Sequence, residues 1–179
     1  MKIGQHVIDR HSPTFIIAEL SANHNGSIKR AKKTILEAKN SGVSAVKIQT
    51  YTPDTMTIDC SQKDFLIKGT IWEGDRLYSL YQKAYTPWEW HEPIMKHARS
   101  RNLLCFSSPF DESAIDFLES LDVPAYKIAS FECIDLPLIK KAANTKKPLI
   151  IIGGGIESSQ TKNELLSFLN NVNIDLTSS

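Results

Sequence analysis

The regular alternation of short apolar runs with longer amphipathic segments constrains the fold of this chain most. Five apolar runs, each too short for a helix, are predicted as strands at residues 15–20, 45–50, 103–108, 125–130 and 149–152. Helical spacing separates them at roughly 27–40, 87–102, 111–121, 136–144 and 158–169. Strands that are apolar on both faces and alternate with helices predict a parallel sheet covered by helices. A barrel and an open doubly wound sheet both satisfy this pattern.

The spacing between the strands is uneven. They begin at residues 15, 45, 103, 125 and 149, so the second connection is about twice as long as the others. The excess is an insertion at about residues 51–85, and it follows the carboxyl end of a strand, where both architectures place ligand-binding loops. We expect an active-site loop with one or two short helices.

The length of 179 residues is short for a complete barrel but sufficient for an open sheet. An eight-fold βα barrel typically takes about 250 residues, whereas only five βα units are visible in this sequence. An open five-stranded sheet would be complete at this length. The chain is therefore either a whole small domain or part of a barrel.

Charge and hydropathy exclude several classes of partner. The 21 basic and 20 acidic residues give a formal net charge of +1, without a Lys/Arg-dense run, so neither nucleic acid nor an anionic membrane surface is an expected partner. No apolar stretch approaches the ~20 residues of a membrane span, and the first residues lack a signal segment, which predicts a cytoplasmic protein. Three cysteines without a CxxC pair predict free thiols.

Two lysines lie inside apolar strands, Lys47 in AVKIQT and Lys127 in AYKIAS. Burial of an ammonium group costs several kcal/mol unless an opposite charge or hydrogen bonds compensate. Each lysine therefore implies an internal carboxylate or a bound anion. The alternatives are a structural Lys–Glu pair, or a side chain that extends to an open strand end.

Other polar residues accompany the lysines. Alternation places Gln49 on the face of Lys47, while Ser108 and Ser130 each close a predicted strand. If the strands are neighbours, these side chains and the two lysines converge at the carboxyl edge of the sheet. Two cations with several neutral donors suit a phosphate, or a phosphate and a carboxylate, as ligand.

The first strand and the turn after it supply three further candidates. Glu19 is the carboxylate at this strand end, and it could transfer a proton, hold sugar hydroxyls or form a salt bridge with Lys47. Asn23 and His24 follow directly and are candidates for substrate contacts. The remaining histidines supply no pair at ligand spacing, so no complete metal site is expected.

Two other patterns carry weaker signals. Gly153-Gly154-Gly155 follows the fifth strand, but it matches neither a dinucleotide fingerprint nor a P-loop, and a tight turn explains it. The chain has no G-x-S-x-G elbow, and Cys105 lies within an apolar strand. Serine or cysteine nucleophilic catalysis therefore has little support.

Four segments together carry a resemblance. FIIAELSANHNG, AVKIQTYTPDT, LLCFSSPFD and AYKIASFE, in this order, resemble the N-terminal barrel half of the sialic acid synthase family, which condenses phosphoenolpyruvate with an N-acetylated sugar. The similarity runs from about residue 13 to 169. The segment IKGTIWEGDRLYSLYQKAYTPWEWH is more similar to the pseudaminic acid synthases than to the N-acetylneuraminate synthases.

The resemblance implies a TIM-type (β/α)8 barrel, here truncated to about five βα units. Residues 1–179 would then be the incomplete N-terminal portion of the barrel domain, without the family's small C-terminal antifreeze-like domain. The full-length relatives are expected to be domain-swapped homodimers. They are also expected to use a divalent metal, Mn²⁺ or Mg²⁺, whose histidine ligands lie on later strands that this chain does not contain. The chain alone is therefore expected to be inactive.

The resemblance also assigns residues to roles. Lys47, Gln49, Ser108, Lys127 and Ser130 match the family's phosphoenolpyruvate contacts. Glu19 matches the strand-one acid near the sugar and the attacking water. One departure is the glycine triplet at 153–155, where the family usually has Ser-Thr-Gly and a hydroxyl directed at phosphate.

Three functional hypotheses follow. The first is synthesis of a nonulosonic acid such as pseudaminic acid from phosphoenolpyruvate and a 2,4-diacetamido-2,4,6-trideoxy hexose, with N-acetylneuraminate synthesis as its variant. The second is another phosphate-binding barrel aldolase that uses Lys47 or Lys127 as a Schiff-base nucleophile. The third is a catalytically inactive fragment that keeps an anion-binding surface or associates with another chain.

Overall fold

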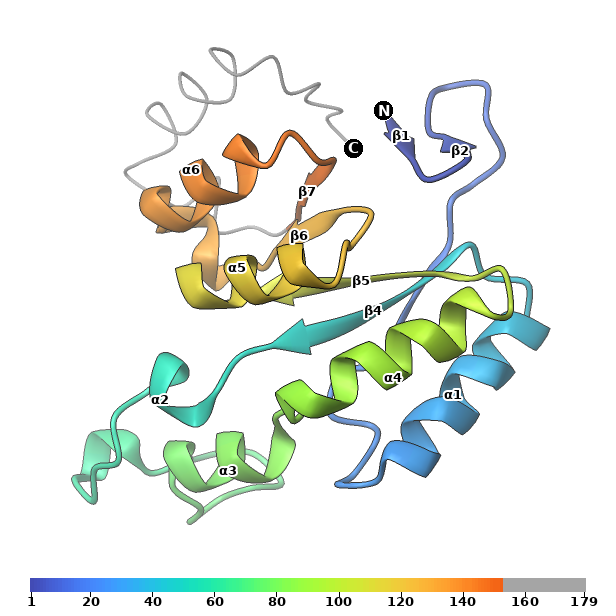
Figure 1. Ribbon diagram of the computed structural model, residues 1–179. Coiled ribbons are helices and arrows are strands. Elements are labelled where there is room, and N and C mark those ends of the chain that lie inside the picture. Colours follow the sequence, from blue (N-terminus) through green and yellow to red (C-terminus); the bar gives the residue numbers. More distant parts are fainter. Residues whose placement is uncertain (153–179) are drawn as a thin grey trace.

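A single five-stranded parallel sheet organises the computed structural model, which describes residues 1–152. Its order is β3-β4-β5-β6-β7, so each strand pairs with the next one along the chain. This order excludes the doubly wound alternative, in which the strand order reverses at a switch point. The sheet is a curled half-barrel (Figure 1), with strands β3 (Ile17–Glu19), β4 (Ala45–Thr50), β5 (Leu104–Pro109), β6 (Tyr126–Ile128) and β7 (Leu149–Ile151).

Four helices follow the strands much as the sequence predicts. They are α1 (Ile28–Asn40), α4 (Trp88–Arg99), α5 (Glu112–Ser120) and α6 (Leu136–Asn144). Side chains cap three of them, because Ser27, Asp111 and Asp135 each accept a hydrogen bond from a backbone N–H of the first turn. The predicted helix at 158–169 lies outside the described residues. No helix within residues 1–152 combines the length and apolar character needed to cross a membrane.

The larger hydrophobic core lies between the sheet and these helices. Alternate strand residues such as Val46 and Ile48 of β4 face the helices, where Ile35 of α1 and Ile94 of α4 pack against them. The same core includes, from β5 to β7, Cys105, Tyr126, Ile128 and Leu149. The helices therefore cover one face of the sheet, and that face is the outside of the half-barrel.

A second, smaller core lies on the inner face, near the amino ends of the strands. Ala45, Phe106 and Ala125 are fully buried there against Ile3. Ile3 belongs to a hairpin of β1 (Lys2–Ile3) and β2 (His6–Val7), which the sequence analysis did not predict because two-residue strands carry no periodic pattern. The hairpin lies beside the amino ends of the strands (Figure 1) and closes this end of the inner face.

The long connection after β4 is folded, as expected. It holds α2 (Pro53–Met56), the 3₁₀ turn η1 (Lys63–Phe65) and α3 (Leu77–Ala84), which confirms the prediction of one or two short helices. The ring of Tyr51 makes edge-to-face contacts with Tyr81 and Phe110, and the Tyr78 hydroxyl donates a hydrogen bond of 2.9 Å to Asp54. These contacts anchor the insertion beyond the carboxyl end of β4 (Figure 1).

Candidate functional site

The inner face changes from apolar to polar toward the carboxyl ends of the strands. Strand register places Glu19 beside Lys47, and Gln49 beside Ser108. Alternation puts these four residues on the same face as the inner core. The predicted convergence of polar side chains at this edge is therefore present in β3, β4 and β5.

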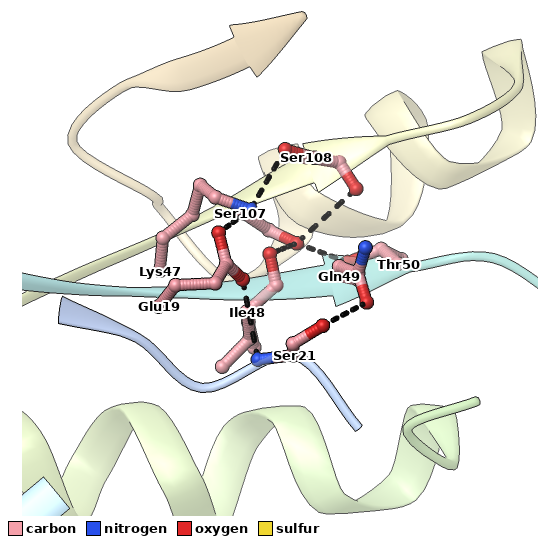
Figure 2. Close-up of polar contacts among 8 residues, drawn as sticks. All are labelled: Glu19, Ser21, Lys47, Ile48, Gln49, Thr50, Ser107 and Ser108. Atoms are coloured by element: carbon pink, nitrogen blue, oxygen red, sulfur yellow. Dashed lines mark hydrogen bonds and ion pairs between the residues drawn. The ribbon is translucent and has the colours of Figure 1, made fainter. Parts of the chain in front are cut away.

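Lys47 is the centre of this polar group (Figure 2). Its Nζ lies 2.5 Å from Glu19 Oε2 and donates a hydrogen bond of 3.2 Å to Ser108 Oγ. The Lys47 side chain is 8% exposed, whereas that of Glu19 is 46% exposed. The ion pair considered from the sequence is thus formed. Because its carboxylate partner is half in solvent, the pair lies at the boundary between the interior and the site.

The electrostatics around Lys47 combine opposing influences. Burial lowers the pKa of the Lys47 ammonium, the Glu19 carboxylate acts in the opposite direction, and the positive charge of Lys127 lowers the pKa further. Lys127 comes from β6, two strands away, and its side chain is partly buried. Two ammonium groups close enough to repel each other favour an anion between them.

Ser21 organises the edge of the site, and the sequence analysis missed it. Its backbone N–H donates to Glu19 Oε1 and its hydroxyl donates to Gln49 Oε1, both at 3.2 Å (Figure 2). The residue adopts φ of 47°, in the left-handed region, which turns the chain sharply after β3. The sequence feature that could have identified Ser21 is a hydroxyl residue directly after the predicted strand at 15–20.

The two predicted turn residues have different environments. Asn23 is exposed. His24 is fully buried, with its Nδ1 accepting from the Gly26 N–H at 3.2 Å and its Nε2 lying 3.3 Å from Thr86 Oγ1. The ring also packs edge-on against Trp90 of α4, and burial lowers its pKa. These contacts occupy both ring nitrogens, so His24 fastens the turn to α4 and has no ring nitrogen left for a substrate.

A second carboxyl group lies just after β6, and it too was missed from the sequence. Ser130 is partly buried and precedes the 3₁₀ turn η2 (Phe131–Ile134), which contains Glu132. Glu132 Oε2 is buried and has no hydrogen-bond partner within residues 1–152. Burial raises the pKa of Glu132, and the Lys127 charge opposes this effect. A carboxyl with a raised pKa beside a lysine is a candidate for proton transfer.

Metal ligands do not gather in the described part of the chain. Residues 1–152 contain no group of three or more His, Cys, Asp or Glu side chains that could hold an ion. The three cysteines are free thiols. The glycine triplet at 153–155, with its predicted turn, lies outside the described residues.

The sequence is similar to curated proteins named as synthases of pseudaminic acid and of N,N'-diacetyllegionaminic acid. The pseudaminic acid synthase of Helicobacter pylori is 49% identical over 166 residues, which are 92% of this chain and 48% of that protein. The N,N'-diacetyllegionaminic acid synthase of Legionella pneumophila is 38% identical over 78% of this chain and 39% of its own length. The chain spans about half the length of the curated relatives it matches.

Solved structures share the fold. The N-acetylneuraminic acid synthetase of Leptospira borgpetersenii superposes with a TM-score of 0.75 over 96% of this chain and 57% of its own, at 22% identity. The spore coat polysaccharide biosynthesis protein SpsE of Bacillus subtilis gives 0.73 over 97% and 45%, at 28% identity. The half-barrel is thus the fold found in part of these larger chains. Residues 34–177 match the NeuB family, and this chain belongs to that family.

Proposed function

We propose that the polar end of the inner face binds phosphoenolpyruvate and forms part of the active site of a nonulosonic acid synthase. The observation that carries the proposal is the buried Lys47 ammonium, which contacts Glu19 and Ser108 at the carboxyl end of the sheet, where the charge of Lys127 from β6 also acts on it. Glu19 compensates the charge of Lys47, and an anionic ligand would compensate that of Lys127. Phosphoenolpyruvate carries both a phosphate and a carboxylate.

The remaining polar groups complete the proposed contacts. Lys47 contacts both Ser108 and Glu19, and the Gln49 amide lies at the same edge. Ser130, which follows β6, is proposed as a further neutral donor. Charge-assisted hydrogen bonds from lysine to phosphate are about twice as strong as neutral ones. The lysines would therefore supply most of the affinity, and the neutral groups the orientation.

In the proposed reaction, C3 of phosphoenolpyruvate attacks the aldehyde carbon of the sugar. Water adds at C2, and phosphate leaves by cleavage of the C–O bond. Within residues 1–152, Glu19, half-exposed beside Lys47, and Glu132, with its raised pKa and an oxygen without a partner in that range, are carboxyl groups that could move protons. The residues described here offer no donor set for Mn²⁺ or Mg²⁺, so no step is assigned to a metal.

We further propose that the insertion at 51–85 selects the sugar. It emerges directly after Gln49 and Thr50, and Tyr51 and Asp54 anchor it there through Tyr81 and Tyr78. Loops on a rigid scaffold usually carry specificity. The 49% identity to pseudaminic acid synthases favours a 2,4-diacetamido-2,4,6-trideoxy hexose over N-acetylmannosamine.

Calorimetry and a phosphate-release assay on the 179-residue chain test the anion site and the chemistry separately. We expect phosphoenolpyruvate to bind, and we expect no phosphate release when Mn²⁺ and the diacetamido sugar are added. Absence of binding would refute the anion site. Metal-dependent turnover close to that of a complete synthase would refute the proposed need for residues beyond this half-barrel.

A chimera tests the sugar. Residues 1–152 would replace the matching segment of the Helicobacter pylori pseudaminic acid synthase, and a second chimera would carry residues 51–85 alone. Both chimeras should prefer the diacetamido sugar. Preference for N-acetylmannosamine would place the chain with the neuraminate synthases.

One observation favours the aldolase alternative. Burial lowers the pKa of Lys47, as the nucleophile of a Schiff-base enzyme requires. The ion pair with Glu19 acts against it, because it keeps the ammonium protonated. Borohydride trapping with a carbonyl substrate separates the two mechanisms, since the proposed synthase reaction forms no covalent imine.

A further inference from the structure

A buried chain of polar side chains lies on the outer face of the sheet, directly behind the anion site. Thr50 Oγ1 is 2.8 Å from His91 Nε2 and 2.6 Å from Ser107 Oγ. The Ser107 hydroxyl also donates to the Ile48 carbonyl at 3.1 Å. Thr50, His91 and Ser107 are all fully buried. Among the apolar residues of this core, they link α4 to the carboxyl ends of β4 and β5.

The partners of His91 favour one direction for the hydrogen bonds. His91 Nδ1 lies 3.2 Å from the Pro87 carbonyl, which can only accept, so this contact favours the tautomer with the proton on Nδ1. In that tautomer His91 Nε2 accepts from the Thr50 hydroxyl, and the Ser107 hydroxyl shares its one proton between Thr50 Oγ1 and the Ile48 carbonyl. Burial lowers the pKa of His91 to about 4, which keeps the ring neutral and this arrangement intact near neutral pH.

The hydrogen-bonded group of Thr50, His91 and Ser107 holds the strand positions next to Gln49 and Ser108, two residues of the anion site. Thr50 follows Gln49, and Ser107 precedes Ser108, so each tethered residue is the immediate neighbour of a site residue whose side chain points to the opposite face (Figure 2). Gln49 and Ser108 are register partners. A displacement of either strand end would therefore change the distance between Lys47 and Ser108.

We propose that His91 is a positioning residue for the anion site, acting through Thr50 and Ser107 on the ends of β4 and β5. The proposal rests on the proposed function, because the site it positions is the phosphoenolpyruvate site. It assigns His91 no contact with the ligand.

Two substitutions of His91 and one matched control test the proposal by calorimetry with phosphoenolpyruvate. His91→Leu introduces an apolar side chain of similar size and removes both polar ring nitrogens, and affinity should fall about tenfold, the effect of losing the buried hydrogen bond to Thr50. His91→Gln retains an acceptor and should recover most of the affinity. Ile94→Val removes one methylene from the same helix and should leave affinity unchanged. Equal affinity in all four proteins would overturn the proposal.

Hydrogen exchange at backbone amides gives a readout that does not need the ligand. In His91→Leu the amides of Gln49, Thr50 and Ser108 should exchange faster by about tenfold, and in Ile94→Val they should not. If His91→Leu fails to fold, Thr50→Val removes the donor to His91 at nearly constant volume and should give the same pattern. Unchanged exchange at these amides would refute the positioning role. Failure of the wild-type chain to bind phosphoenolpyruvate, with the exchange pattern as expected, would refute only the proposed ligand.

Discussion

The two ends of the inner face have opposite characters although the same strands build them. At the amino end the side chains are apolar and sealed by the hairpin that carries Ile3. At the carboxyl end they are charged or polar and centred on Lys47. Two residues along each strand separate the two environments, in the pairs Ile17 and Glu19, Ala45 and Lys47, Phe106 and Ser108, and Ala125 and Lys127.

This contrast separates stability from function along the strands. Burial of apolar area at the amino end stabilises the fold by about 25 cal/mol per Å². Burial of the Lys47 ammonium at the other end costs free energy that Glu19 and Ser108 offset. A substitution at the amino end should therefore change the free energy of unfolding, and a substitution at the carboxyl end should change the affinity for phosphoenolpyruvate.

The largest effect on folding is expected at the amino end. Phe106→Ala removes a fully buried ring that packs with Ile3, Ala45 and Ala125. The free energy of unfolding, measured by urea denaturation, should fall by about 3–5 kcal/mol. The folded fraction should still bind phosphoenolpyruvate with wild-type affinity. Weakened affinity in molecules that remain folded would show that the two ends are coupled.

Acid should destabilise the fold through His91, which lies on the outer face of the sheet behind the polar carboxyl end. Its folded pKa of about 4 lies below the ordinary value of 6.5, so the unfolded chain binds the proton more readily and stability falls as pH decreases through this window. The loss attributable to His91 should approach about 3 kcal/mol by pH 4. Urea unfolding of the wild type and of His91→Leu at pH 7 and pH 4.5 isolates the loss of stability that protonation of His91 causes. An identical pH dependence in both proteins would contradict it.

Lys47→Met tests charge at the carboxyl end. Methionine keeps most of the apolar stem and deletes the ammonium, so phosphoenolpyruvate affinity should fall by about 2–3 kcal/mol with little change in unfolding free energy. Lys96→Met, at an exposed lysine on α4 paired with Glu92, is the control and should change neither quantity appreciably. Unchanged calorimetric affinity in Lys47→Met, and in the equivalent Lys127→Met, would refute the site.

The smallest effect is expected from removing the negative charge beside Lys47. Glu19→Gln keeps a hydrogen-bonding side chain but no longer neutralises the ammonium at 2.5 Å. Phosphoenolpyruvate should therefore bind more tightly, by about 1 kcal/mol for this half-exposed group. Weaker binding measured by calorimetry would indicate that Glu19 supports the ligand rather than competing with it.

Local patterns explain why so much of the fold was predictable. The strand at 45–50 and the helix at 136–144 match the structure residue for residue, because periodicity and capping residues identify both. The β1–β2 hairpin was not predicted, since Ile3 is fixed by contact with residues more than 40 positions away. The helix predicted at 87–102 begins at Trp88 and ends at Arg99, and Thr86 just before it is buried beside His24.

The site was predictable where an isolated charge interrupts an apolar strand. Lys47 and Lys127 stand out for this reason, and Gln49 and Ser108 follow by alternation. Ser21, Glu132 and the Thr50–His91–Ser107 chain did not stand out, because hydroxyl and acidic residues are ordinary at strand and helix ends. Their roles depend on which elements meet in space, as the packing of α4 behind β4 and β5 shows for His91.

The central claim is that the carboxyl end of the inner face is an anion site built on two lysines. A crystal structure of the 179-residue chain grown with phosphoenolpyruvate tests it most directly. We expect oxygen atoms of the ligand within hydrogen-bond distance of both Lys47 Nζ and Lys127 Nζ, on the carboxyl side of the inner core that contains Phe106 and Ile3. Phosphoenolpyruvate bound elsewhere, with Lys47 still held by Glu19 and Ser108 alone, would contradict it.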